Sequence, residues 1–246
     1  MPKFIKWPTR EEIIIISESF KRHKGFPNIV GAIDGTHIKI AAPKSDPESY
    51  INRKGFHSMQ LQVVCDNKMQ FLYCYVGNAG SLHDQRVFRL SKLQNICNDE
   101  NNFPCNGHLI GDAAYMIQKH LLVPFKDNGH LTRIQKNFNY CLSSTRMVIE
   151  RSIGLLKGRF RTLLDRLPMT RTDLILKHIM ACCVLHNVCL LKNDLIVESI
   201  IIDTQERHQE NNDIPTILRM QGIQKRNEVA NSLQMVLYPH AFFFPR

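Results

Sequence analysis

The chain has 246 residues, a length that one α/β domain can fill and at which folding needs no disulfide staples. Eight scattered cysteines, none in a Cys-x-x-Cys pair, argue against a small disulfide scaffold and indicate reduced core thiols of an intracellular protein. No stretch reaches the roughly 18 consecutive apolar residues of a membrane span, and the chain does not start with a signal peptide, so we expect no membrane association.

The formal net charge of +10 is unevenly distributed. Residues 194–246 contain five Lys or Arg and seven Asp or Glu, a net charge of −2, so residues 1–193 carry +12. A basic excess in the part expected to fold suits a polyanionic partner such as nucleic acid. Many basic proteins bind no nucleic acid, so charge alone does not decide the function.

The first predicted elements are a helix and three strands. A helix over residues 9–24 is capped by Thr9, and the alternating apolar pattern of residues 29–42 predicts a long strand. Two further strand patterns, His57–Cys65 and Met69–Val76, are joined by Asp66-Asn67-Lys68 and predict a hairpin.

The rest of the chain predicts alternating helices and short strands. In order, we expect a helix over 82–92, a polar loop over 94–107, a strand over 108–111, a helix from Asp112 to about His120, a strand over 121–123, an irregular segment over 124–141, a helix from Ser143 or Ser144 to about Arg161, and a helix over 171–192. Residues 203–232 lack a clear pattern and are expected to be surface segments or poorly ordered.

This order predicts an α/β fold, a mixed sheet flanked by helices, which matches the RNase H-like architecture. We expect a short amino-terminal remnant over residues 1–28, an RNase H-like domain over 29–193, and a partly disordered tail over 194–246.

Three carboxylates stand in positions that favour chemistry. Asp34 interrupts an apolar strand, where a carboxylate must be paired or bound to a metal ion. Asp112 follows a short buried strand, at the end where α/β sheets place ligands, although it could be an ordinary helix N-cap. Glu150 lies beside the apolar stripe of a helix, although it could be a solvated residue paired with Arg146, four residues earlier.

Together, Asp34, Asp112 and Glu150 are the ligand set expected of a two-metal phosphoryl-transfer site. Mg²⁺ or Mn²⁺ takes oxygen ligands and keeps several waters, so a few carboxylates suffice. Two such ions about 3.5–4 Å apart can activate a water and stabilise the leaving oxygen. We expect Asp34 to bridge the two ions.

The chain resembles the PIF/Harbinger transposases and the host nucleases derived from them, a branch of the DDE superfamily. The matching segments cover residues 4–190 in order. They are Gly25-Phe26-Pro27, Gly31–Ile38, Asn52–Gly55 with His57-Ser58, Gly80-Ser81 with His83-Asp84, Gly111-Asp112 with Tyr115, Val148–Arg151, Leu156-Lys157, Arg159-Phe160 and Ala181–Asn187.

The resemblance implies that the three carboxylates are a catalytic triad that holds a divalent metal cation, Mg²⁺ or Mn²⁺, in an RNase H-like fold. It also implies DNA as partner, a nuclear location, assembly into a homo-oligomer and, as for some members, a separate Myb-like DNA-binding protein. Family members carry a long helical region before the first catalytic strand, whereas about 30 residues precede Asp34 here.

Asp84 is a candidate fourth metal ligand by the same resemblance. The sequence Ser81-Leu82-His83-Asp84 also predicts a capping box, in which Asp84 would serve the helix instead. The motif Cys183–Cys189 places sulfur and imidazole at helical spacing, but four zinc ligands are needed and no second cluster lies near it, so a buried helix is the better interpretation.

Six basic residues are candidates for DNA phosphate contacts, which provide affinity without sequence information. They are Arg53, Lys54, Arg146, Lys157, Arg159 and Arg161. An ordinary solvated loop or basic helix face remains the alternative interpretation. The leading hypothesis is therefore a metal-dependent endonuclease, and its rivals are an inactive DNA- or partner-binding protein and a degenerate transposon copy.

Overall fold

A computed structural model describes residues 3–194 and 216–235. Its helices are α1 (Arg10–Lys24), α2 (Asp84–Leu90), α3 (Lys92–Asn98), α4 (Arg133–Arg159), α5 (Thr172–Leu191) and α6 (Thr216–Ser232). Its strands are β1 (Ile29–Lys39), β2 (Ser58–Cys65), β3 (Phe71–Ala79), β4 (His108–Ile110) and β5 (Leu121–Leu122).

The five strands form one mixed sheet in the order β3-β2-β1-β4-β5. The strand β2 pairs antiparallel with β1 and with β3, whereas β4 pairs parallel with β1 and with β5. The central strand β1 is buried from Ile29 to Gly35, as its nearly continuous apolar sequence requires. The predicted α/β fold, a mixed sheet flanked by helices in the RNase H-like arrangement, is confirmed.

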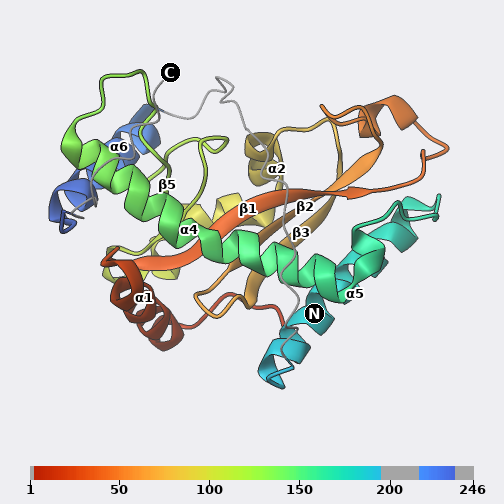
Figure 1. Cartoon of the computed structure of the whole chain (residues 1–246), viewed down its shortest axis with the longest axis horizontal. Helices are drawn as coiled ribbons and strands as arrows, with labels where there is room; N and C mark the ends of the chain where they lie inside the picture. The colour runs from red at the N-terminus through yellow and green to blue at the C-terminus, as the bar shows by residue number, and fades with distance from the viewer. Residues whose placement is uncertain (1–2, 195–215, 236–246) are drawn as a thin grey trace, which may run out of the picture.

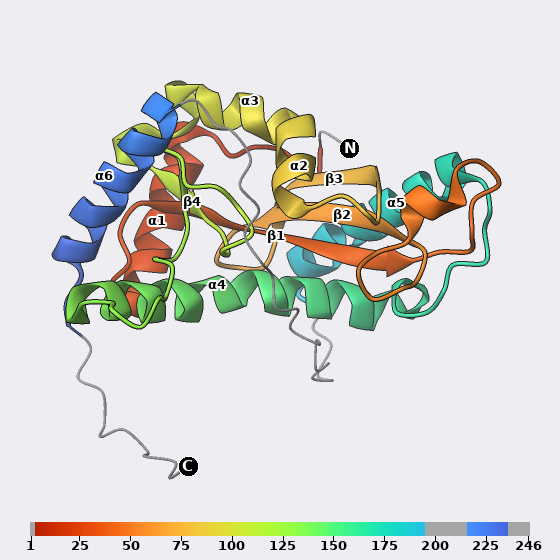
Figure 2. The same cartoon turned by 90° about the horizontal axis from the view of Figure 1, so that it is seen from above.

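Helices cover both faces of the sheet (Figure 1). Figure 2 shows the sheet between α4 on one side and α2 and α3 on the other. Helix α1 packs against β1 and α4, and α5 packs against β3. Helix α1 begins at the predicted cap: Glu12 N–H donates to Thr9 Oγ1 (3.3 Å), and Thr9 N–H donates to Glu12 Oε2 (2.7 Å).

Four local predictions are wrong. The expected loop over 94–107 contains most of α3, and Asp112 is followed by turns rather than by a helix. Helix α4 begins at Arg133, ten residues before the expected cap. Thr216–Ser232 form α6, which packs against α4 and β5, so this part of the expected tail is ordered secondary structure. The expected disorder elsewhere in the tail concerns residues 195–215 and 236–246, which lie outside the described ranges.

The early start of α4 has a local cause. Thr132 and Gln135 form a capping box, with Gln135 N–H donating to Thr132 Oγ1 (3.3 Å) and Thr132 N–H donating to Gln135 Oε1 (3.0 Å). The first turns are polar on their outer side, yet Phe138 and Leu142 are buried at helical spacing. Burial of this stripe continues α4 through the segment that polarity alone marked as irregular.

Helix α5 is long and apolar enough to span a bilayer, since an 18-residue window has a mean hydropathy of 1.9. Core helices pass the same test, and Ile175, Ile179 and Cys183 of α5 are buried in the domain core. Two polar residues near its carboxyl end fasten the β2–β3 hairpin. His186 Nε2–H donates to Met69 O (2.9 Å), and Asn187 bonds to both backbone groups of Phe71.

We predict that Asn187→Ala lowers the free energy of unfolding by about 2–4 kcal/mol, because it leaves several buried backbone groups without their partner. Asn187 Oδ1 accepts a hydrogen bond from Phe71 N–H, and Asn187 Nδ2 donates to the carbonyl oxygens of Phe4 and Phe71, each at 2.8 Å. Urea denaturation followed by circular dichroism measures the change. Leu185→Ala, at a half-exposed position of the same helix, serves as the control and should change stability much less.

Helix α6 brings a lysine into the domain interior. Lys225 is 4% exposed, and its Nζ donates to Gly107 O (2.8 Å). Burial, with a smaller contribution from Lys119, lowers the pKa of Lys225 to about 7, while Glu228 and Glu100 oppose the shift. The neighbouring imidazoles of His108 and His120 also have lowered pKa values, mainly because they are buried.

This lowered pKa makes the contribution of Lys225 to stability depend on pH. Below pH 7 the Lys225 side chain is charged in both the folded and the unfolded chain, and burying this charge lowers the stability of the folded state. Between pH 7 and about 10.4 only the unfolded chain keeps the proton, so stability rises with pH in this window. We therefore expect Lys225→Met to be more stable than wild type at pH 6 and to lose this advantage by pH 10.

Thermal unfolding of both proteins across this pH range tests the prediction. Arg219→Met makes the same kind of change at an exposed position of α6 and should show no such trend. A stability difference between wild type and Lys225→Met that stays constant from pH 6 to pH 10 would contradict the assignment.

Candidate active site

Asp34 lies in the middle of β1 and is 4% exposed. Its carboxylate binds groups from different parts of the chain: Oδ1 accepts Gly35 N–H (2.7 Å), and Oδ2 accepts Arg146 Nη1–H of α4 (3.1 Å). The expectation that a carboxylate in this strand requires a compensating charge is met by an arginine.

Asp112 is held level with Asp34 by the sheet. Ile110 of β4 pairs with Ala32 of β1 in parallel register, and each aspartate follows two residues later. Adjacent strands lie about 4.8 Å apart, so Asp112, just beyond the carboxyl end of β4, lies beside Asp34 on β1. Asp112 Oδ1 accepts Ala114 N–H (3.0 Å) and closes a turn, so the interpretation of Asp112 as the cap of a following helix is wrong.

Glu150 approaches from α4, which crosses the sheet. Its Oε1 accepts a hydrogen bond from Arg146 Nη2, so the i−4 pair considered from the sequence is present. The pair does not lie on a solvated face, however, because the same guanidinium also binds Asp34. The side chains of Arg146, Asp34 and Glu150 are 16%, 6% and 26% exposed.

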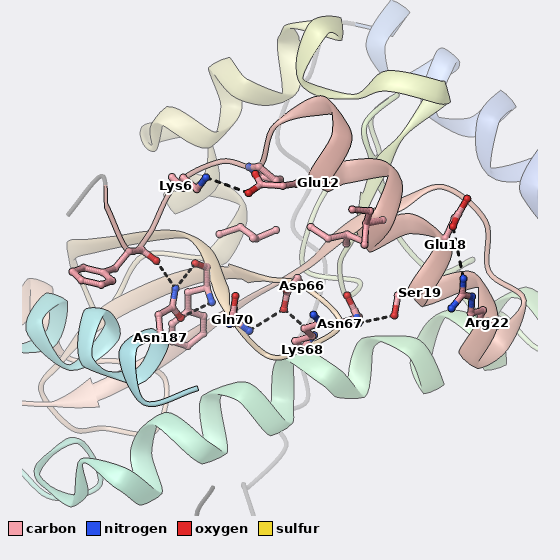
Figure 3. A pocket seen from close by; sticks show the side chains of 16 residues that line it. Lys6, Glu12, Glu18, Ser19, Arg22, Asp66, Asn67, Lys68, Gln70 and Asn187 are labelled. Atoms are coloured by element: carbon pink, nitrogen blue, oxygen red, sulfur yellow. Dashed lines mark hydrogen bonds and ion pairs between the residues drawn. The ribbon is translucent and has the colours of Figure 1, made fainter. Parts of the chain in front are cut away.

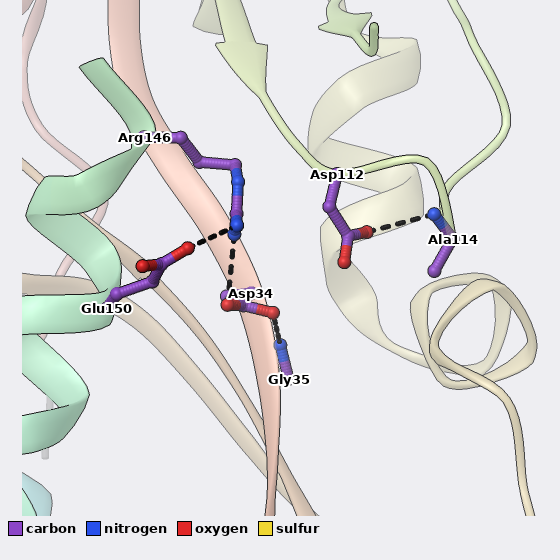
Figure 4. Close-up of polar contacts among 6 residues, drawn as sticks. All are labelled: Asp34, Gly35, Asp112, Ala114, Arg146 and Glu150. Atoms are coloured by element: carbon purple, nitrogen blue, oxygen red, sulfur yellow. Dashed lines mark hydrogen bonds and ion pairs between the residues drawn. The ribbon is translucent and has the colours of Figure 1, made fainter. Parts of the chain in front are cut away.

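The three carboxylates therefore come from β1, from the end of β4 and from α4. Figure 4 shows Asp34 between Glu150 and Asp112, with the Arg146 guanidinium between Asp34 and Glu150. Across the described parts of the chain, no three His, Cys, Asp or Glu side chains are grouped closely enough to hold one metal ion. The donor set nevertheless fits a cation, because the carboxylates of Asp34 and Glu150 already share a positively charged group.

Asp84 approaches the site from the other face of the sheet. It is the first residue of α2, whose N-cap is His83, and His83 makes no capping bond with its side chain; the predicted capping box is therefore wrong. The Asp84 carboxylate instead accepts a hydrogen bond from Gln60 Nε2 of β2. A Cβ on Gly35 would lie 2.2 Å from Asp84 Oδ1, so Gly35 is what allows this carboxylate to approach β1 next to Asp34.

The six basic candidates do not form one surface. Arg53 and Lys54 are exposed in the loop before β2, and Arg53 Nη2 lies 2.8 Å from His83 Nδ1, next to Asp84. Arg159 is turned toward the end of α5, where it binds the carbonyl oxygen of Asp194 and lies 3.6 Å from its carboxylate. Arg161 is exposed after the end of α4.

Lys157 faces the sheet rather than the solvent. Its Nζ donates to Thr36 Oγ1 (2.8 Å) and to His37 O (3.2 Å), beyond Asp34 on β1. Burial, followed by repulsion from Lys39, lowers the pKa of Lys157 to about 8, while Asp34 opposes the shift. Arg146 and Lys157 therefore place two positive groups of α4 along the same strand as Asp34.

The comparison with protein families adds to this geometry. The family model described as DDE superfamily endonuclease matches residues 33–187, a range that contains all three carboxylates. This chain is a member of the DDE superfamily endonucleases. No solved structure matches it.

Individual relatives support the Harbinger branch. The chain is 34% identical to "Putative nuclease HARBI1" of Rattus norvegicus and 32% identical to the Homo sapiens protein of that name; each match covers 76% of this chain and 54% of the relative. It is 29% identical to "Protein ALP1-like" of Arabidopsis thaliana, over 77% of this chain and 49% of that protein. The chain thus spans about half the length of these relatives.

Two residues beside the candidate active site were not singled out from the sequence. Gln60 supports Asp84, and Thr36 receives Lys157. Gln60 is 2% exposed in a strand that is buried throughout, so a polar residue in that apolar pattern was an available signal. Nothing local marks Thr36, because its partner is 121 residues away.

A separate hollow lies between the amino-terminal segment, α1 and the β2–β3 turn (Figure 3). None of the candidate site residues lines it. Several of its polar side chains are paired within the wall, including Lys6 with Glu12 (3.2 Å) and Asn67 with Ser19 (2.7 Å). The hollow is therefore distinct from the candidate active site.

We predict that Gly35→Ala lowers the free energy of unfolding by about 1–3 kcal/mol, because the added methyl group collides with the Asp84 carboxylate. Combining it with Asp84→Gly should recover most of the loss. A double-mutant cycle measured by urea denaturation gives the coupling between the two positions. Additive effects would show that Asp84 does not occupy the space beside Gly35.

Proposed function

We propose that this chain is the nuclease core of a Harbinger-derived protein and hydrolyses DNA phosphodiester bonds with Mg²⁺ or Mn²⁺ by a two-metal mechanism. The observation that carries the proposal is the convergence of Asp34 and Glu150, which are far apart in the sequence, on one cationic group. The parallel register that sets Asp112 level with Asp34 supports it.

Asp34, Asp112 and Glu150 are the residues that would hold the metal ions, with Asp84 as a further candidate. When bound, the ions would activate a water and neutralise the charge on the leaving oxygen. The protein contributes fixed positions: β1 and β4 hold the two aspartates level, and α4 presents Glu150 across from Asp34. Asp34 is oriented by Gly35 N–H and is largely shielded from water, which strengthens its attraction for a cation.

DNA is the proposed substrate, and basic residues around the site would contact its phosphates. Arg53 and Lys54 lie in the loop beside Asp84, and Arg161 is exposed beyond the end of α4. Such contacts bind the backbone irrespective of sequence and weaken with salt. A nuclear location, assembly into a homo-oligomer and a Myb-like DNA-binding partner are part of the same proposal, on the ground of the resemblance alone.

A second candidate function is DNA binding without cleavage. The ion pairs of Arg146 favour it, because they give Asp34 and Glu150 a structural partner that needs no metal ion. This alternative predicts salt-sensitive DNA binding and no cleavage with any divalent metal ion. Cleavage by the purified protein would exclude it.

The decisive variant is Asp34→Asn, which keeps the shape of the side chain and removes its charge. We expect metal-dependent cleavage of plasmid DNA to fall by more than about 100-fold. Loss of a residue that only supports a metal ligand costs up to about 100-fold, and loss of a ligand itself should cost more. Asp112→Asn and Glu150→Gln should do the same, each with a cooperative melt. Asp165→Asn, at an exposed position, is the matched control and should cleave like wild type. Cleavage that survives in Asp34→Asn would contradict the proposal.

A further inference from the structure

Arg146 touches two of the proposed metal ligands at once. Its Nη1 lies 3.1 Å from Asp34 Oδ2, and its Nη2 donates to Glu150 Oε1 (Figure 4). The guanidinium of an arginine side chain carries a positive charge in proteins and has five N–H donors and no acceptor. Arg146 is thus a permanent cation between two carboxylates.

The surroundings make this cation necessary. Asp34 and Glu150 together carry two negative charges, and Asp34 is nearly excluded from solvent. A buried carboxylate without a compensating charge is strongly unfavourable. Asp34 acts to raise the pKa of Lys157, but the hydrogen bonds of that lysine go to Thr36 and His37. Arg146 therefore supplies the charge that lets the two carboxylates stand side by side.

The same contacts set up a competition. Asp34 Oδ2 and Glu150 Oε1 are oxygens that a divalent ion would use, and Arg146 engages both. A cation that binds these oxygens must break two charge-assisted hydrogen bonds and accept repulsion from the guanidinium. The Arg146 side chain is 16% exposed, so it is not fully enclosed by the protein.

We propose that Arg146 is an exchangeable internal counterion: it positions Asp34 and Glu150 for cation binding and, by competing for their oxygens, lowers the affinity of the site for divalent metal ions. Arg146 is in this sense a positioning residue that also sets a threshold of metal concentration. The inference rests on the proposed function, because it takes Asp34 and Glu150 as the metal ligands.

The test is calorimetric titration of MnCl₂ into wild type, Arg146→Gln and Arg151→Gln, with thermal unfolding of each protein with and without Mn²⁺. Arg151 is exposed on the same helix, so Arg151→Gln removes the same charge without touching the site. We expect Arg146→Gln to bind Mn²⁺ at least about tenfold more tightly than wild type. Without Mn²⁺ the Arg146→Gln variant should melt at a lower temperature than wild type, and addition of Mn²⁺ should raise its melting temperature more than that of wild type. Arg151→Gln should match wild type in both measurements.

Equal or weaker binding by Arg146→Gln, with cleavage by wild type intact, would overturn the inference and leave the proposed function standing. Binding of Mn²⁺ by Arg146→Gln but not by wild type would support the inference, with Arg146 excluding the metal ion completely under the conditions of the titration. Absence of binding in both would overturn the inference together with the metal-dependent part of the proposed function. If Arg146→Gln does not fold, Arg146→Lys takes its place in the test. One ammonium group cannot bind both carboxylates as a planar guanidinium does. We therefore expect the Arg146→Lys variant to bind Mn²⁺ more tightly than wild type.

Discussion

A carboxylate in the middle of a sheet needs a positive charge from the layer above it, and the contact between Asp34 and Arg146 provides that charge. Much of the arrangement around the site follows from this contact. Helix α4 must cross β1 with Arg146 over Asp34, which places Glu150, one turn later, on the same side. Lys157, two further turns along, then lies over Thr36. The ion pair and the buried stripe of α4 together are consistent with one rotation of the helix that completes the site.

The opposite face of the sheet is organised around a gap left by a missing side chain. Gly35 follows Asp34, and the space where its Cβ would stand is taken by the carboxylate of Asp84. Gln60 holds that carboxylate from β2, so the hairpin and the start of α2 are tied to the strand that bears Asp34. Acidic side chains consequently approach the same short stretch of β1 from both faces. Such crowding of negative charge needs cations, and Arg146 and Lys157 supply them from α4.

The sequence predicted the sheet well because strand periodicity is a local signal. The long strand β1 was predicted from alternation, the hairpin from its turn residues, and the strand before Asp112 from a short apolar run. The helix expected after Asp112 does not form, because Tyr115 is buried against Phe88 and Met116 N–H donates to the Gln85 side chain instead of to a helical carbonyl. The three carboxylates were identified by their unusual settings. The second partner of Arg146 could not be foreseen, since Asp34 lies 112 residues before it in the chain.

The docking of α6 has a consequence for how copies of this protein behave beside one another. The strand β5 is only two residues long and ends the sheet on its side. Arg226 of α6 donates to the carbonyl of Pro124 (3.1 Å), just beyond β5, and stacks over Phe125. Sheet margins with unoccupied backbone groups recruit strands from other molecules and so nucleate aggregates. The short strand β5 and the helix packed against it leave few free backbone groups at this edge of the sheet, which disfavours pairing with strands of other molecules.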